Sequence, residues 1–227
     1  MKEIRAHKDN TLALQCYDYL QNCIIDGTLA PGQKLKVEAL KEQLGIGQSP
    51  IREALSRLVA SGLVTVQDNK GFWVAQVSEE DIRDTYRVFV QIELLALKQA
   101  IELGDDAWES GIVAALHNLA LVETRQVETS VQVWIERNYS FHLALIVGCN
   151  SPLLLDLREQ VYRRFHRYCW LSYDALNSRL EFSHEEHKSL AQAVISRNFP
   201  EAEKIMTHHV YRAFETVVTR LKQNNTL

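Results

Sequence analysis

Three histidines and an asparagine are spaced so that separate helices could bring their side chains together. Asn138 and His142 are four residues apart, so on a helix they lie on one face, one turn from each other. His187 and His209 lie in two later segments, and facing helices of a bundle can direct such residues into a common core. Three imidazoles and one oxygen donor around an open position suit zinc, nickel or another borderline divalent ion. On spacing alone, each histidine is more often an ordinary core or surface residue, so this hypothesis needs further support.

A second group of polar residues lies on the outer face of a helix that is predicted to begin near Ser49-Pro50. Proline suits the first helical turn, and Gly62 ends the pattern. The residues at helical spacing on the inner face are Ile51, Ala54, Leu55, Leu58 and Val59. The residues on the outer face are Gln48, Ser49, Arg52, Ser56 and Arg57.

These outer residues have the chemistry needed to contact DNA. The guanidinium fork of Arg52 can pair with O6 and N7 of a guanine, and Gln48 and Ser49 can add hydrogen bonds. The lysines placed to meet phosphates, which position a domain without reading sequence, are Lys34, Lys36 and Lys70. The alternative is that Arg52 and Arg57 are solvated charges on an ordinary amphipathic helix.

The segments around this helix have the pattern of a winged helix-turn-helix. Two helices are predicted before it, at about 11–26 and 37–44, and Gly45-Ile46-Gly47 makes a tight break. After it, Asp68-Asn69-Lys70-Gly71 has hairpin-turn chemistry and is flanked by two predicted strands, 63–67 and 72–77. In such a domain the third helix enters the major groove. This context favours a role of Arg52 and Arg57 in DNA contact over the alternative that they are solvated charges.

Strand patterns disappear after residue 77. Ser78 can cap the next helix, and three acidic residues follow in its first turn, where negative charge suits the helix dipole. Further helical segments are predicted at about 78–103, 105–127, 128–147, 152–172, 179–197 and 200–222. The predicted fold is therefore mainly α, with a winged helix-turn-helix at 1–77 joined to an all-α bundle of six or seven helices at 78–227.

The first domain resembles the GntR family of bacterial regulators. The segment from Gly47 to Leu55, followed by Leu58 and Gly62-Leu63-Val64, is similar to the recognition-helix signature of that family. The wing pattern, Asn69-Lys70-Gly71 with Val74, is similar as well. The resemblance implies DNA contacts by Gln48, Ser49, Arg52, Lys70 and Gly71. Members commonly carry an arginine where this chain has Gln48, so the base preference at that contact is expected to differ.

The second domain resembles the all-helical ligand-binding (FCD-type) domain of the FadR-like branch of that family. The resemblance lies in Asn138-x-x-Phe141-His142, Glu186-His187 and Met206-x-x-His209-Val210. It implies a metal site formed by Asn138, His142, His187 and His209. Many members have aspartate where Asn138 stands, and an amide oxygen brings no negative charge. Metal affinity is therefore expected to be lower, or a water to intervene.

The resemblance also implies that an effector binds in this domain, beside Phe89 and Glu93. Glu93 stands where the family has a glutamate, but Phe89 stands where relatives often have an arginine that faces the effector. A dicarboxylate ligand therefore does not carry over simply to this chain. Because three neutral histidines leave a divalent ion its full +2 charge, an anionic ligand is favoured in the open position. A small organic acid is the expected effector.

Composition fits a protein that works on DNA in the cytoplasm but does not demonstrate it. The formal net charge is −4, yet residues 1–77 hold nine Lys/Arg and eight Asp/Glu. The excess of acidic residues thus lies outside the predicted DNA-binding domain. Four cysteines show no paired spacing and are expected to be reduced. No apolar run is long enough for a membrane span, and no secretory segment is expected.

Two other functions remain open from the residues alone. A metal-ion sensor would use the same four site positions, with the ion itself as the signal. A helical-bundle metalloenzyme is disfavoured, because Glu181-x-x-His184 is only one of the two Glu-x-x-His pairs that di-iron bundles need. We therefore expect a regulator and not an enzyme. Since one recognition helix reads few base pairs, we also expect a homodimer on palindromic, double-stranded operator DNA. The expected direction of regulation is repression.

Overall fold

The computed structural model describes residues 11–67, 71–124, 131–172, 184–224 and 226–227. The chain divides into two compact units. The first unit contains residues 1–82, 163–174 and 217–227, and the second contains residues 83–162 and 175–216. The domain division predicted at residues 77–78 stays a prediction.

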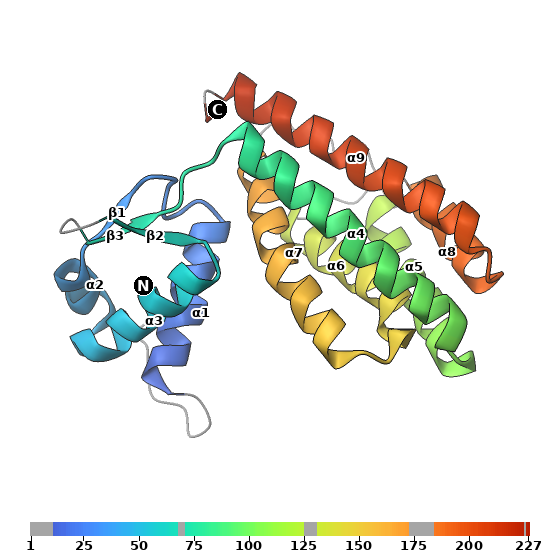
Figure 1. Cartoon of the computed structure of the whole chain (residues 1–227), viewed down its shortest axis with the longest axis horizontal. Helices are drawn as coiled ribbons and strands as arrows, with labels where there is room; N and C mark the ends of the chain where they lie inside the picture. The colour runs from blue at the N-terminus through green and yellow to red at the C-terminus, as the bar shows by residue number, and fades with distance from the viewer. Residues whose placement is uncertain (1–10, 68–70, 125–130, 173–183, 225) are drawn as a thin grey trace. The chain divides into compact units, whose positions relative to one another are not determined.

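The first unit contains the predicted three helices and a small sheet (Figure 1). Its helices are α1 (Leu12–Ile25), α2 (Val37–Leu44) and α3 (Gln48–Ala60). Its strands are β1 (Lys34–Leu35), β2 (Val64–Gln67) and β3 (Gly71–Val74), which pair antiparallel in the order β1-β3-β2. The two longer strands confirm the predicted wing. The two-residue strand β1 was not predicted, because a segment that short has no readable alternation.

Local sequence explains why α3 has a fixed position. Thr11 caps α1, since its side chain accepts a hydrogen bond from the backbone N–H of Leu14. Gly45 ends α2 in the left-handed conformation, with φ of 66°, which turns the chain toward α3 at little cost. The apolar face of α3 then packs into a core with α1, formed by Cys16, Leu20, Ile24, Ile51, Ala54, Leu55 and Leu58. The opposite face of α3 is left exposed.

The second unit is built from helices, as predicted, and three of these helices (α4, α7 and α9) extend into residues of the first unit. The helices of the described chain after residue 78 are α4 (Glu79–Leu103), α5 (Asp106–Glu123), α6 (Val131–Ile146), α7 (Pro152–Ser172), α8 (His184–Ile195) and α9 (Phe199–Gln223), with a 3-10 turn η1 (Val147–Cys149). The starts predicted at Ser78 and Asp105 are confirmed by side-chain caps, Ser78 to Asp81 N–H and Asp105 to Trp108 N–H. The predicted helical residues 125–130 and 179–183 lie outside the described part of the chain.

Aromatic and apolar contacts hold these helices together. Tyr86 of α4 packs edge-on against Phe214 of α9, with ring centroids 5.4 Å apart. Trp108 of α5 donates a hydrogen bond of 2.9 Å to the carbonyl of Ala144 on α6. These contacts fix the spacing of the helices that carry the site residues. Within the described residues, no helix is both long and apolar enough to span a membrane.

Candidate functional site

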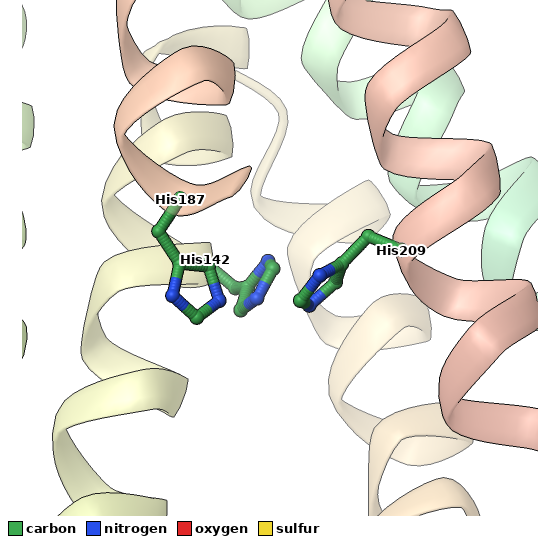
Figure 2. Close-up of side chains that lie close together, drawn as sticks. All are labelled: His142, His187 and His209. Carbon is green, nitrogen blue, oxygen red and sulfur yellow. The ribbon is translucent and has the colours of Figure 1, made fainter. Parts of the chain in front are cut away.

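Three histidines from three different helices converge in the second unit. His142 lies on α6, His187 on α8 and His209 on α9, and their possible ligand atoms all lie within 4.8 Å of one another. Figure 2 shows the three imidazole rings directed toward one another. The side chains of His142 and His187 are buried and that of His209 is mostly buried. Nitrogen atoms at this separation could bind one divalent ion in common.

Asn138 completes the predicted set of four residues. It lies one turn before His142 on α6, so both side chains are on the same face. Its Oδ1 is buried and has no hydrogen-bond partner among the described residues. A buried amide oxygen without a partner is costly and calls for an explanation. A bound ion, directly or through a water, would satisfy this oxygen, so the donor set fits a metal.

Two carboxylates lie behind the histidines. Oε1 of Glu123 is 2.9 Å from Nδ1 of His187, and Oε2 of Glu186 is 3.0 Å from Nδ1 of His209. Glu186 is hydrogen-bonded to His209, whereas Glu123 lies at ion-pair distance from His187 without an aligned hydrogen bond. A carboxylate beside Nδ1 can orient a ligating imidazole and leave its Nε2 free for the metal. Glu186 is in turn held by Arg212, at 2.9 Å. The outer residues therefore also fit a metal site.

Burial sets the charge of these groups. It lowers the pKa of His142 well below its usual value, with further contributions from the nearby His209, His187 and Arg158. Burial also lowers the pKa of His209, although Glu186 opposes the shift. The pKa of Glu123 is lowered, because its contacts with the histidines and with Trp134 outweigh the effect of burial. Neutral imidazoles backed by a charged carboxylate are the state that binds a metal.

The lowered pKa of His142 predicts how the stability of the metal-free protein depends on pH. Below the ordinary histidine value of 6.5, the unfolded chain binds a proton at this position and the folded protein does not. The free energy of unfolding should therefore fall as the pH decreases through this range. Urea unfolding at several pH values, in the presence of a metal chelator, measures this free energy. His142→Gln should have a shallower pH dependence than the wild type, and equal slopes would contradict the assignment.

The structure places four of the predicted DNA contacts along one side of α3. Ser49 and Arg52 are exposed, and within the described residues the Arg52 guanidinium makes no hydrogen bond or ion pair. Gln48 is half-buried and donates a hydrogen bond to Glu38. Arg57 pairs with Glu53 at 2.7 Å, and both side chains are about half exposed. Arg52 is thus the cation of α3 that an incoming duplex could engage without breaking an existing contact.

The remaining predicted contacts lie at the sheet, apart from Lys36, which is exposed and immediately precedes α2. Lys34 in β1 is exposed, and its Nζ lies 5.4 Å from the centre of the Trp73 ring. Gly71 begins β3 with φ of 89°, a conformation that favours glycine. Lys70 lies outside the described residues. The exposed parts of the sheet near Lys34 and Gly71 are the places where a wing could meet the DNA backbone.

The predicted effector residues meet an arginine that sequence reasoning missed. Phe89 and Glu93 are both buried on α4, and Nε of Arg158 on α7 is 2.7 Å from Oε1 of Glu93. Glu123 was missed as well. Neither residue has a local signal, because its partner is distant in the chain and only the packing of helices joins them. Glu186 could be found from its position beside His187.

Comparison with known proteins agrees with this architecture. Residues 12–74 match the family model described as bacterial regulatory proteins, gntR family, and residues 84–212 match the FCD domain model. The HTH-type transcriptional repressor GlaR of Escherichia coli (strain K12) is 35% identical over 202 residues, which cover 87% of this chain and 92% of GlaR. The chain belongs to the GntR family.

Other transcription regulators match this chain over most of their length. The regulator BphR of Paraburkholderia xenovorans (strain LB400), itself uncharacterized, is 32% identical over 88% of this chain and 83% of BphR. Among solved structures, E. coli McbR/YncC superposes with a TM-score of 0.73 at 26% identity, covering 91% of this chain and 98% of that one. These relatives are transcription regulators and not enzymes. The chain is thus a DNA-binding transcription regulator with an FCD domain, as its motifs predict.

Proposed function

We propose that this GntR-family regulator binds operator DNA as a homodimeric repressor and responds to a small organic acid bound at a metal site in its helical unit. The observation that carries the proposal is the convergence of His142, His187 and His209 within 4.8 Å. A bound zinc or nickel ion would supply positive charge and an open position for an anion. The name of the relative GlaR, a transcriptional repressor, supports the direction of regulation.

The chain's own residues would have distinct tasks at this site. His142, His187 and His209 would donate nitrogen atoms, and Asn138 its unpartnered Oδ1. Glu123 would hold the ring of His187 in place through Nδ1. Phe141 packs edge-on against His142 and His187, with centroids 5.4 and 5.2 Å away, and would keep water from this side of the rings.

On the DNA side, Gln48, Ser49 and Arg52 would touch base edges in the major groove, with Arg52 as the guanine contact. Arg57, Lys34 and the wing at Lys70 and Gly71 would contact the backbone. The pair between Arg57 and Glu53 is exposed and worth little, so DNA could displace it. Two copies of α3 in a dimer would read a palindrome with half-sites about one helical turn apart. A regulator that binds operator DNA would act in the cytoplasm, which is the location expected from the sequence.

The effector can change operator affinity only by binding two arrangements of the dimer unequally. The test is to measure affinity for a duplex selected by the wild-type protein, first against zinc or nickel alone and then with organic acids added. The proposal predicts that metal alone has little effect and that an acid changes the affinity. A full switch by metal alone would instead establish a metal-ion sensor, and no response to either would contradict regulation through this site.

Removing the carboxylate behind His187 should weaken metal binding without removing a ligand. In Glu123→Gln the side chain keeps its size but loses its charge, so His187 is less well oriented and less basic. Metal affinity is expected to fall about 10- to 100-fold, measured by competition with a chelator. Glu136→Gln, at an exposed position on α6, is the matched control and should bind as the wild type does. Equal affinities in the two variants would count against the proposed role of Glu123.

A further inference from the structure

Arg158 is a buried arginine whose hydrogen-bonding capacity is only partly used. Its side chain is 1% exposed, and Nε donates a 2.7 Å hydrogen bond to Oε1 of Glu93. Nη1 and Nη2 are buried and have no hydrogen-bond partner among the described residues. The carboxylate of Glu159 lies 3.9 Å from Nη1, too far for a hydrogen bond. An entire edge of the guanidinium is therefore unsatisfied.

Such an arrangement is costly unless something else binds there. A buried charged group that lacks partners carries a large desolvation penalty, and native proteins rarely leave one unexplained. Glu93 carries a similar desolvation penalty, because its Oε2 is also buried without a hydrogen-bond partner in the described chain. The ion pair between Glu93 and Arg158 thus satisfies one donor and one acceptor and leaves three polar atoms open. Within the described residues, no acceptor pairs with Nη1 or Nη2 of this arginine.

The surroundings of Arg158 determine how an acceptor could approach. Its Cζ lies 4.6, 5.1 and 5.6 Å from the ring centres of Tyr162, Tyr139 and Phe89. These rings pack around the guanidinium, while Glu93 occupies the Nε side. The Nη1–Nη2 edge has no hydrogen-bond partner among the described residues, and its geometry matches the two oxygens of a carboxylate.

Arg158 also lies close to the histidine site. Tyr139, which borders Arg158, directly follows Asn138 on α6, one turn before His142. The unpartnered Oδ1 of Asn138 and the open edge of Arg158 therefore belong to one region of the second unit. Phe89 of α4 borders Arg158, so the positive charge in this region comes from α7.

We propose that Nη1 and Nη2 of Arg158 bind a carboxylate of the effector side-on, and that Arg158 is the specificity-determining residue for acids in this regulator. The inference rests on the proposed function for the existence of an effector. Its ligand class is a small carboxylic acid, held by Arg158 at one end and lying toward the histidines. Glu93 is then a positioning residue that holds the guanidinium through Nε.

The test is calorimetric titration of zinc-loaded, full-length protein with acetate, succinate and benzoate. The wild type should bind at least one probe at millimolar concentration, and Arg158→Gln should weaken that binding by about tenfold or more. Arg158→Lys, which keeps the charge but not the fork, should weaken it less. Arg87→Gln removes an exposed arginine of α4 and should bind the probe as the wild type does.

A second variant covers the case in which Arg158→Gln fails to fold because the Glu93 carboxylate is left unpaired. The double variant Glu93→Gln/Arg158→Gln removes both charges and should show the same loss of probe binding. Wild-type protein that binds none of the probes, or a double variant that binds them as well as the wild type, would overturn the inference.

Metal content and operator affinity of the same preparations separate this inference from the proposed function. If both are normal and probe binding does not depend on Arg158, only the inference fails. If metal or operator binding is absent but the probes still bind through Arg158, the proposed function fails and the assignment of Arg158 stands.

Discussion

Purified His187→Ala protein is expected to contain almost no bound divalent metal under conditions in which the wild type stays loaded. His187 is 1% exposed, and its ring centre lies 4.9 Å from that of His209 and 5.6 Å from that of His142. The substitution removes one of the proposed donors and also separates Glu123 from the site. Because losing an outer residue alone costs about 10- to 100-fold, losing a ligand should cost more. Elemental analysis and chelator competition measure the result.

His208→Ala is the matched control for this prediction. His208 is next to His209 on α9, but its side chain is 71% exposed and it does not belong to the converging triad. It should retain metal like the wild type, so a general effect of losing a histidine from the bundle can be recognised. The metal site as proposed is incorrect if His187→Ala retains as much metal as His208→Ala.

Arg52→Ala is expected to weaken operator binding strongly while leaving the fold intact. The side chain is exposed on α3 and makes no ion pair within the described chain, so its removal costs little folding energy. A bidentate contact to guanine is worth about 1–3 kcal/mol, or roughly 5- to 150-fold in affinity for each half-site. A dimer loses it twice. Fluorescence anisotropy with the duplex selected by the wild type measures the loss, and circular dichroism checks the fold.

Arg57→Ala provides the comparison on the same helix. Arg57 is already paired with Glu53 and is proposed to meet the backbone, so its loss should weaken binding less and equally for all sequences. Arg52→Ala should in addition relax the preference for guanine at one position of each half-site. If Arg52→Ala binds the operator as tightly as the wild type does, Arg52 does not contact the DNA as proposed.

Much of the fold follows from local sequence patterns. The apolar spacing of Ile51, Leu55 and Leu58 predicts the buried face of α3, and these side chains are 0% exposed. The helix predicted at about 152–172 is α7, which begins at Pro152 and ends at Ser172. Such signals are readable because caps, turns and helical faces involve residues a few positions apart. The strand β1 escapes them, since its two residues are defined only by pairing with β3.

Part of the site could be predicted from the sequence. The residues that could not be predicted are those whose partners lie far away along the chain. The histidines could be grouped because the motifs around them resemble a known family. The pairing of Glu93 with Arg158 spans 65 positions and depends on how α4 and α7 pack. Glu123 likewise meets His187 only after α5 and α8 come together. No periodicity or capping rule predicts such contacts. The charged residues that make them shift the pKa values of the groups around the site.

We propose that the exposed side of α3 reads DNA sequence and that the helical ligand-binding unit controls this binding. Selection of duplexes from a random pool by the full-length, zinc-loaded protein tests it most directly. The proposal predicts enrichment of a palindrome with guanines in both half-sites, about one helical turn apart, and loss of this enrichment in Arg52→Ala. A pool that remains random with wild-type protein, or the same palindrome recovered by Arg52→Ala, would contradict it.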